Sequence, residues 1–305
     1  MHNATLRALI FLVLFGKITA HASNYTYEKR TMDHHVIHIV TLDSKDYEPQ
    51  IVKADSIKKR EPVSVLAKRF GASVAINGGF FEIGGKRDGI SSGTLVIKGH
   101  PYRLRDFVQS LVVIGSGGLV ITRANPKKHM DPQASILSSI PLLVKEGEVV
   151  KDLFEKKSEF FLSPHARTAL GIRKDGAIVI VVAEHHYIKD LNKLRMDEVR
   201  LLMKEKECEI LQKYHHKNLD DITLKELKEI LRNEYTSSDG VSGLSILKLA
   251  HLMKEMECDD AINLDGGSSS ALWVEDKIVN LKEKPKKGAV ITEKAVPNAI
   301  IFKRK

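Results

Sequence analysis

The sequence is poor in cysteine, in aromatic residues and in long hydrophobic runs. Its only cysteines are Cys208 and Cys258, and no Cys-x-x-Cys spacing occurs. This argues against a zinc site of the cysteine type and leaves open whether the two thiols pair. A single tryptophan and an aromatic content of 6% argue against the arginine–aromatic interleaving of nucleic-acid-binding surfaces. We therefore expect no nucleic-acid partner.

The formal net charge is +9. Much of the excess lies in lysine-rich stretches such as Lys282–Lys287 and in the tail Lys303-Arg304-Lys305. A positive balance suits an anionic substrate or an acidic cell envelope, and it is equally compatible with solubility and loose attraction to anionic surfaces. Charge alone does not choose between these alternatives.

The one long apolar run lies at the N-terminus. Arg7 precedes the run Ala8–Gly16, and Ala20-His21-Ala22 then places small residues where signal peptidase reads them. The run is about half of the ~20 residues that span a bilayer. We interpret residues 1–22 as a cleaved signal peptide; a retained membrane anchor is the alternative. The mature chain, residues 23–305, is then secreted or periplasmic, with no stable membrane anchor.

Short β-branched segments and glycine turns dominate the mature chain. Strands are predicted at Val36–Leu42, Ser73–Asn77, Thr94–Ile97, Ser110–Ile114, Gly118–Ile121, Pro141–Val144, Thr168–Ile172, Ala177–Ala183, Ala261–Leu264, Ser270–Val274 and Val296–Phe302. Helices are predicted at Pro62–Phe70, which Gly71 ends, and from Leu244 to about Met256. Strands scattered around a few helices, without regular alternation, indicate the α+β class with a mixed β-sheet core.

A charged, glycine-free segment with helical spacing interrupts this pattern from about Lys189 to Tyr235. Within it, Thr223-x-x-Glu226 is typical of a capping box at a helix start. We interpret residues from about 188 to 238 as a helical hairpin inserted into one domain. It is a lid or an arm that binds a protein partner, or else an insertion with a solvated charged face.

The most informative motif is Asn263-Leu264-Asp265-Gly266-Gly267-Ser268-Ser269-Ser270. Double glycine lets the backbone approach a ligand, and successive N–H groups can bind an anion. Asp265 aims a carboxylate at the same space, although a tight turn alone is the alternative. The segment Ala75-Ile76-Asn77-Gly78-Gly79 repeats the run from Ala-Ile-Asn into double glycine. Two such loops facing one cleft would form a site.

Arg167 enters an apolar strand in the segment His165–Gly171. Because a buried arginine is costly without a partner, we expect a carboxylate such as Asp265 or a bound phosphate beside it. A structural salt bridge is the alternative. The pairs His34-His35 and His185-His186 lack the spacing of a metal site, and adjacent strand residues point to opposite faces. We expect no metal and no cofactor.

Four motifs, in this order, resemble the phosphodiester glycosidase family. They are Ala75-Ile76-Asn77-Gly78-Gly79-Phe80-Phe81, Arg167-Thr168-Ala169-Leu170-Gly171, Ala261-Ile262-Asn263-Leu264-Asp265-Gly266-Gly267-Ser268 and Val296-Pro297-Asn298-Ala299. The resemblance implies an enzyme that removes N-acetylglucosamine from a sugar-1-phosphodiester, and its bacterial relatives are linked to envelope or exopolysaccharide sugars. The chain departs from the family pattern at Lys248, where an acid is expected, and at Glu184-His185-His186, which replaces an Asp-Gly turn.

The resemblance and the motifs together predict the site. We expect Asp265, Arg167 and, as a second carboxylate, Glu82 to be catalytic. We expect substrate binding by Asn77, Gly78, Gly79, Thr168, Asn263, Gly266, Gly267, Ser268 and Ser269. Because the leaving phosphomonoester is a stabilised anion, Arg167 and the Gly266, Gly267 and Ser268 amides should stabilise its charge. Asp265 is then a nucleophile, a water-activating base or a stabiliser of the oxocarbenium-like carbon.

Two other functions stay open. A phosphodiesterase attacking phosphorus usually needs two metals bridged by carboxylates, and the sequence shows no such ligand cluster. A non-catalytic protein on the same fold would bind an anionic envelope glycan or a host partner.

Overall fold

The computed structural model describes residues 25–32, 35–56, 59–184, 221–235, 243–280 and 293–305, with isolated positions between 196 and 218. The predicted signal peptide, most of the predicted insertion and Cys208 lie outside the described residues. Within the described part of the chain, no helix is long and apolar enough to cross a membrane.

The described chain is mostly strand. The strands are β1 (Tyr25–Met32), β2 (His35–Leu42), β3 (Tyr47–Lys53), β4 (Val74–Asn77), β5 (Leu95–Ile97), β6 (His100–Arg103), β7 (Gln109–Gly115), β8 (Gly118–Ala124), β9 (Ser135–Ser138), β10 (Leu142–Lys145), β11 (Glu148–Val149), β12 (Arg167–Arg173), β13 (Ile178–Ala183), β14 (Cys258–Asn263), β15 (Leu272–Val274), β16 (Lys277–Ile278) and β17 (Asn298–Arg304). The helices are α1 (Val63–Phe70), α2 (Glu159–Leu162), α5 (Leu224–Tyr235) and α6 (Ile246–Glu255).

These strands form three sheets. A seven-stranded sheet has the order β1-β2-β13-β12-β14-β10-β11, and two five-stranded sheets have the orders β16-β15-β4-β17-β3 and β6-β5-β9-β7-β8. Among the described strands every pairing is antiparallel, so the prediction of a mixed sheet was wrong. Antiparallel strands need no helical crossover between them, which explains why so few helices accompany so many strands.

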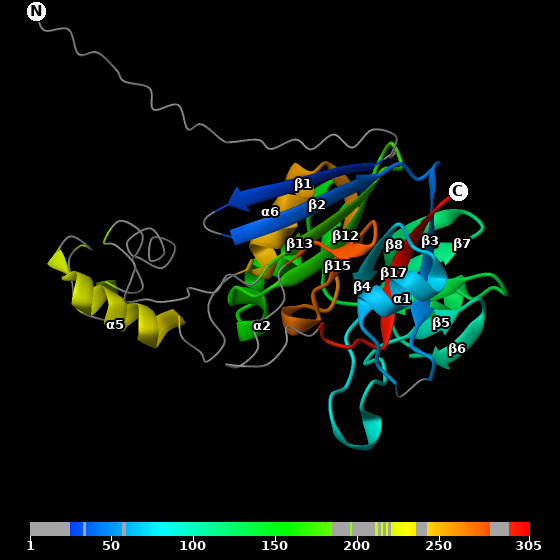
Figure 1. Ribbon diagram of the computed structural model, residues 1–305, viewed down its shortest axis with the longest axis horizontal. Coiled ribbons are helices and arrows are strands. Elements are labelled where there is room, and N and C mark those ends of the chain that lie inside the picture. The colour runs from blue at the N-terminus through cyan, green and yellow to red at the C-terminus, as the bar shows by residue number, and fades with distance from the viewer. Residues whose placement is uncertain are drawn as a thin grey trace, which may run out of the picture.

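The inner strands of the seven-stranded sheet (β2, β13, β12, β14 and β10) contribute to two cores because their side chains alternate between faces. One face, with Ala169 and Val181, packs against α6 residues such as Leu249, and Figure 1 shows α6 behind this sheet. The other face, with Leu170 and Val182, meets side chains of both five-stranded sheets in one shared core. The outer face of the β4 sheet is covered by α1.

The predicted helix boundaries follow local chemistry. Gly71 adopts a left-handed conformation with φ 66° and ends α1, as the sequence predicted. Ser245 caps α6 by accepting a hydrogen bond from the Lys248 amide at 3.3 Å. The described part of the predicted insertion contains α5, which begins directly after Thr223, and the predicted capping box is present because Thr223 and Glu226 exchange hydrogen bonds at 3.0 and 3.3 Å. The first helix of the expected hairpin, from about Lys189, lies almost entirely outside the described residues.

Cys258 is a buried free thiol. Burial raises its pKa to about 12, which keeps it protonated at neutral pH. Its sulfur lies where a β-carbon on Gly171 would come within 2.5 Å. Glycine in the Arg-Thr-Ala-Leu-Gly motif therefore makes room for β14 beside β12.

Candidate active site

The two loops that follow the Ala-Ile-Asn strands lie against each other. Asn77, at the end of β4, donates from Nδ2 to the backbone oxygen of Asp265 at 2.7 Å. The Asp265 amide donates to the Gly78 carbonyl at 3.0 Å. The expected juxtaposition of these loops is therefore present, and it joins the β4 sheet to the seven-stranded sheet.

Asn77 is a fully buried tie between these elements. Besides its bond to Asp265, its Oδ1 accepts hydrogen bonds from the Thr168 hydroxyl at 2.8 Å and from the Ala271 amide at 3.1 Å. The polar atoms of the Asn77 amide and the Thr168 hydroxyl thus bond to each other and to the backbone. This geometry gives both residues a holding role, and substrate binding by them stays a prediction.

Replacing Asn77 by alanine should destabilise the fold by about 3–5 kcal/mol. The substitution removes three hydrogen bonds and leaves the buried Ala271 amide without its partner, at a cost of about 1–3 kcal/mol for each unsatisfied group. Urea unfolding followed by circular dichroism measures the change in the free energy of unfolding. As a control, Asn125→Ala removes an exposed cap, which should cost only about 1 kcal/mol.

The glycines of both loops make room for close backbone packing. A β-carbon on Gly79 would lie 2.7 Å from the Ser138 carbonyl oxygen, and one on Gly266 would lie 2.7 Å from the Ala166 carbonyl oxygen. The Gly266 amide donates to Asp265 Oδ1 at 2.9 Å, and the Gly267 amide donates to Ala166 at 2.7 Å. Both amides are therefore bonded within the protein in this conformation, and anion binding by them stays a prediction.

Other residues that we predicted to bind substrate also form hydrogen bonds or pack closely within the protein. The Gly79 amide donates to Asn298 Oδ1 at 2.9 Å, and a β-carbon on Gly78 would overlap that same side chain. Ser268 is partly exposed on a short turn that follows Asp265, and Ser269 is buried in it. The Val-Pro-Asn-Ala motif therefore positions the first double glycine, which its sequence alone did not indicate.

Asp265 is partly buried and carries the most perturbed carboxyl group described near these loops. Burial raises its pKa above the ordinary value of 3.8. The Ser269 hydroxyl, the Gly266 amide and the positive charge of Lys294 pull the pKa back down without cancelling the effect of burial. A carboxyl group whose pKa is raised by burial is a candidate for an acid–base role.

Arg167 is buried, with 2% of its surface exposed, and it does not bond to Asp265. Its Nε donates to the Leu244 carbonyl at 3.0 Å, and its Nη2 donates to the carbonyls of Phe160 at 2.8 Å and Ser163 at 3.1 Å. Among the described residues no carboxylate lies within 4.0 Å of it, so the structural salt bridge is not found there. Burial lowers its pKa to about 10, which still leaves a cation at neutral pH.

Glu82 is placed differently from the prediction. Its carboxylate pairs with Arg87 at 2.6 Å and with Arg103 at 3.3 Å on the loop after the first double glycine. In the described part of the chain, no hydrogen bond or ion pair joins Glu82 to the Asp265 loop. The structure thus offers no support for Glu82 as the second carboxylate, because two arginines already neutralise it.

Two features of the site escaped the sequence analysis or gained weight from the structure. Lys294 lies close enough to Asp265 to act on its charge, and its ammonium sits 5.5 Å from the centre of the Phe81 ring. A lysine in a lysine-rich chain gives no sequence signal for this position. Asn263 donates to the Ile140 carbonyl at 2.6 Å, while its buried Oδ1 has no partner within the described residues. An unpaired buried oxygen of this kind can accept a hydrogen bond from a hydroxyl group of a ligand.

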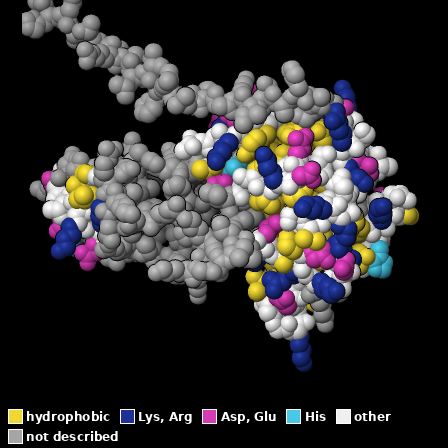
Figure 2. Space-filling view, viewed as in Figure 1, with side chains coloured by type: hydrophobic (Ala, Val, Ile, Leu, Met, Phe, Trp, Pro, Cys, Tyr) yellow, Lys and Arg dark blue, Asp and Glu magenta, His cyan; other side chains and the backbone are white. Residues whose placement is uncertain are grey.

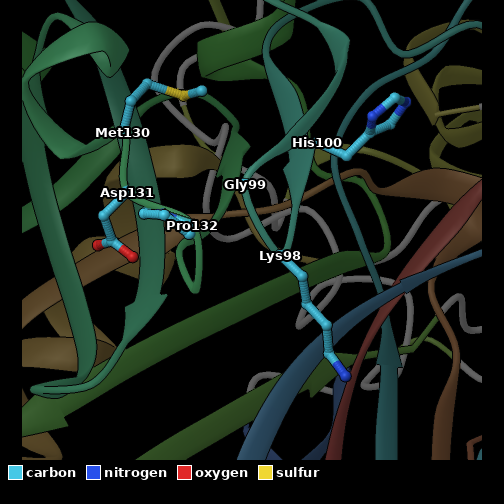
Figure 3. Close-up of a pocket in the computed structure, with 6 residues that line it drawn as sticks. All are labelled: Lys98, Gly99, His100, Met130, Asp131 and Pro132. Carbon is cyan, nitrogen blue, oxygen red and sulfur yellow. The ribbon is translucent and has the colours of Figure 1, made fainter.

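The surface pocket found in the described part of the structure lies away from the predicted site residues. A shallow pocket of about 500 Å³ lies between the β5–β6 turn and the loop before β9, and Figure 3 shows residues that line it. None of the predicted site residues lines this pocket. On the face that Figure 2 shows, Lys and Arg side chains are interspersed with Asp and Glu. The buried polar and charged groups around the Asp265 loop are therefore the stronger candidate for the active site.

The family model described as phosphodiester glycosidase matches residues 70–210 and 222–303. The chain belongs to this family. The match contains both double-glycine loops, the strand of Arg167 and the last strand, β17, so it covers every element that positions the site. A phosphodiester glycosidase domain supports hydrolase chemistry of the glycosidase type.

The relatives and solved structures that resemble this chain are distant in sequence. An uncharacterized protein of Rickettsia conorii is 27% identical over 292 residues, covering 62% of this chain and 99% of the relative. The zebrafish N-acetylglucosamine-1-phosphodiester alpha-N-acetylglucosaminidase catalytic domain, auto-inhibited by its pro-peptide, matches with TM-score 0.62 and 18% identity, covering 95% of this chain and 88% of that one. A hypothetical protein from Synechocystis matches with TM-score 0.55 and 13% identity, covering 92% and 62%. These structures share the fold.

Proposed function

We propose that the chain is a glycosidase that cleaves the bond between the anomeric carbon and the phosphate oxygen of a sugar-1-phosphodiester, of the N-acetylglucosamine type. The products are the free sugar and a phosphomonoester. The observation that carries the proposal is Arg167, a buried cation without a carboxylate partner in the described residues, on the strand beside the Asp265 loop.

A phosphodiester would complete the surroundings of this cation. A buried guanidinium is expensive unless an anion compensates its charge, and phosphate oxygens accept hydrogen bonds from it in good geometry. When the glycosidic bond breaks, the phosphate gains a second negative charge. The attraction of Arg167 therefore grows toward the transition state, which accelerates the reaction.

Asp265 is the carboxyl group that acts at the sugar. It sits at the end of the strand that pairs with the strand of Arg167, and its raised pKa suits proton exchange or charge stabilisation near the anomeric carbon. The unpaired Oδ1 of Asn263 can accept a hydrogen bond from a sugar hydroxyl. Binding by Gly78, Gly79, Thr168, Ser268 and Ser269 belongs to the same proposal, through the backbone and hydroxyl groups that hold the loops in place.

The cellular context is part of the proposal. The family match supports the reaction class, and the similarity to the zebrafish N-acetylglucosamine-1-phosphodiester alpha-N-acetylglucosaminidase supports the choice of N-acetylglucosamine as the sugar. The apolar N-terminus favours secretion or a periplasmic location, where an anionic envelope glycan is a natural substrate. A protein partner at residues 188–238 is compatible with this location. We propose no cofactor.

Purified protein should release free N-acetylglucosamine from N-acetylglucosamine-α-1-phospho-methyl-mannoside, and a metal chelator should not prevent it. Chromatography of the products identifies the broken bond, because attack at phosphorus releases sugar phosphate instead of free sugar. Release of sugar phosphate would support a phosphodiesterase. No release from several sugar phosphodiesters, with binding retained, would support a non-catalytic glycan-binding protein.

A further inference from the structure

A buried acid–imidazole pair lies outside the predicted site. His38 Nε2 and Glu184 Oε1 are 2.5 Å apart, and the two side chains are 0% and 2% exposed. The hydroxyl of Tyr27 lies 2.7 Å from His38 Nδ1 and completes a short hydrogen-bonded chain. Burying a carboxylate costs free energy, and buried carboxylates of this kind are common at functional sites.

Strand register places Glu184 beside the Asp265 loop. Arg167 pairs with Ala183, so Glu184 follows at the next position of β13, opposite Ala166. On the other side of β12, the Ala166 carbonyl accepts the Gly267 amide at 2.7 Å. The backbones of Gly267 and Glu184 thus flank Ala166, the residue before β12, and are about 10 Å apart at two strand spacings of ~4.8 Å.

The side chains of Glu184 and Arg167 leave this sheet on opposite faces. Arg167 bonds to Leu244 and Phe160, which belong to the core on the α6 side. Val182 belongs to the core between the sheets, and Glu184 follows it by two residues, which places it on that same face. The end of β12 therefore has a cation on one face and a carboxylate on the other.

We propose that Glu184, positioned by His38, is the second carboxylate of the site and that the enzyme inverts the anomeric carbon. This rests on the proposed function, with the phosphate bound on the Arg167 side. Glu184 takes a proton from a water molecule while the water oxygen forms its bond to the anomeric carbon. The carbon–oxygen bond to phosphate breaks, and its electron pair leaves with the phosphomonoester. In an inverting reaction the base and the leaving group lie on opposite sides of the anomeric carbon, and Glu184 and Arg167 leave the sheet on opposite faces in the same way.

Proton NMR of the first product tests the stereochemical part in the wild-type protein. With the α-configured phosphodiester, inversion gives β-N-acetylglucosamine as the initial anomer, before mutarotation. Retention, seen as an initial α anomer, would overturn the inference while leaving the proposed function intact. Absence of hydrolysis by the wild type would overturn both.

Variants of Glu184 test its role. E184Q keeps the volume and a hydrogen bond to His38 but cannot accept the proton, so kcat should fall about 10²-fold or more with little change in KM. The control E48Q makes the same change on an exposed residue of β3 and should keep wild-type kcat. In E184A, added azide should restore turnover and give the β-glycosyl azide, because azide needs no deprotonation. Wild-type kcat in E184Q, or a folded E184A that azide does not rescue, would overturn the inference.

Discussion

Asp265→Asn should lower kcat about 10³-fold or more while the protein stays folded. Asparagine has nearly the same shape and can keep the bond from the Gly266 amide, but it cannot carry negative charge beside the anomeric carbon or exchange a proton. Release of N-acetylglucosamine, measured under saturating substrate, gives the change in kcat. Asp131→Asn on the distant loop before β9 is the matched control, and it should keep wild-type activity. An active Asp265→Asn enzyme would contradict the role of this carboxyl group.

The same substitution should not lower thermal stability at neutral pH. The pKa of Asp265 is raised in the folded protein, so the folded state favours the protonated carboxyl more than the unfolded state does. Its contribution to stability is therefore fully present below the ordinary pKa of 3.8 and is lost as pH rises through the raised value. An asparagine at this position has no charge to desolvate, so the variant should unfold at a Tm equal to or above that of wild type at pH 7. A lower Tm would show that the charged form is stabilised by contacts beyond Lys294.

Local patterns in the sequence predict most of the strands and the meeting of the two loops. Runs rich in β-branched residues mark β2 and β13, and Gly71 marks the end of α1, because each signal lies within a few residues. The repeated Ala-Ile-Asn pattern marks β4 and β14 for the same reason. β1 contains the consecutive charged residues Glu28-Lys29-Arg30 and β3 begins with Tyr47-Glu48-Pro49-Gln50, so neither shows a strand pattern and both were missed. Whether pairing is parallel depends on the path of the whole chain, and the prediction of a mixed sheet failed there.

The partners of the site residues could not be predicted because they come from distant parts of the chain. Arg167 is satisfied by carbonyls near Phe160 and Leu244, which its own strand does not specify. Glu82 follows the first motif directly in sequence, but its carboxylate forms an ion pair with Arg103 of β6. In the sequence, His38 is a single polar residue within an apolar strand. The pairing register of β2 with β13 places its side chain within hydrogen-bonding distance of Glu184. Adjacency in sequence was therefore a poor guide to the second carboxylate.

Arg167→Gln should reduce kcat/KM by about 10²- to 10³-fold and abolish stabilisation by phosphate-bearing ligands. N-acetylglucosamine-1-phosphate at about 100 times its Kd should stabilise the wild type by about 2.7 kcal/mol, seen as a rise in Tm. Without the cation, that ligand loses its charge-assisted hydrogen bonds, which are roughly twice as strong as neutral ones. Arg123→Gln, an exposed arginine on β8, is the control that should keep both properties.

The structural role of Arg167 has to be separated from its role in binding. Its guanidinium also holds three backbone carbonyls near α2 and α6, so Arg167→Gln should unfold more easily than wild type even without ligand. Arg167→Lys keeps the charge and gives up the fork of donors that reaches those carbonyls. If Arg167 binds phosphate, Arg167→Lys loses stability but still gains Tm from N-acetylglucosamine-1-phosphate, whereas Arg167→Gln gains none. An equal ligand-induced rise in Tm in the wild type and both variants would show that Arg167 has only a structural role. It would also remove the main support for a phosphodiester substrate.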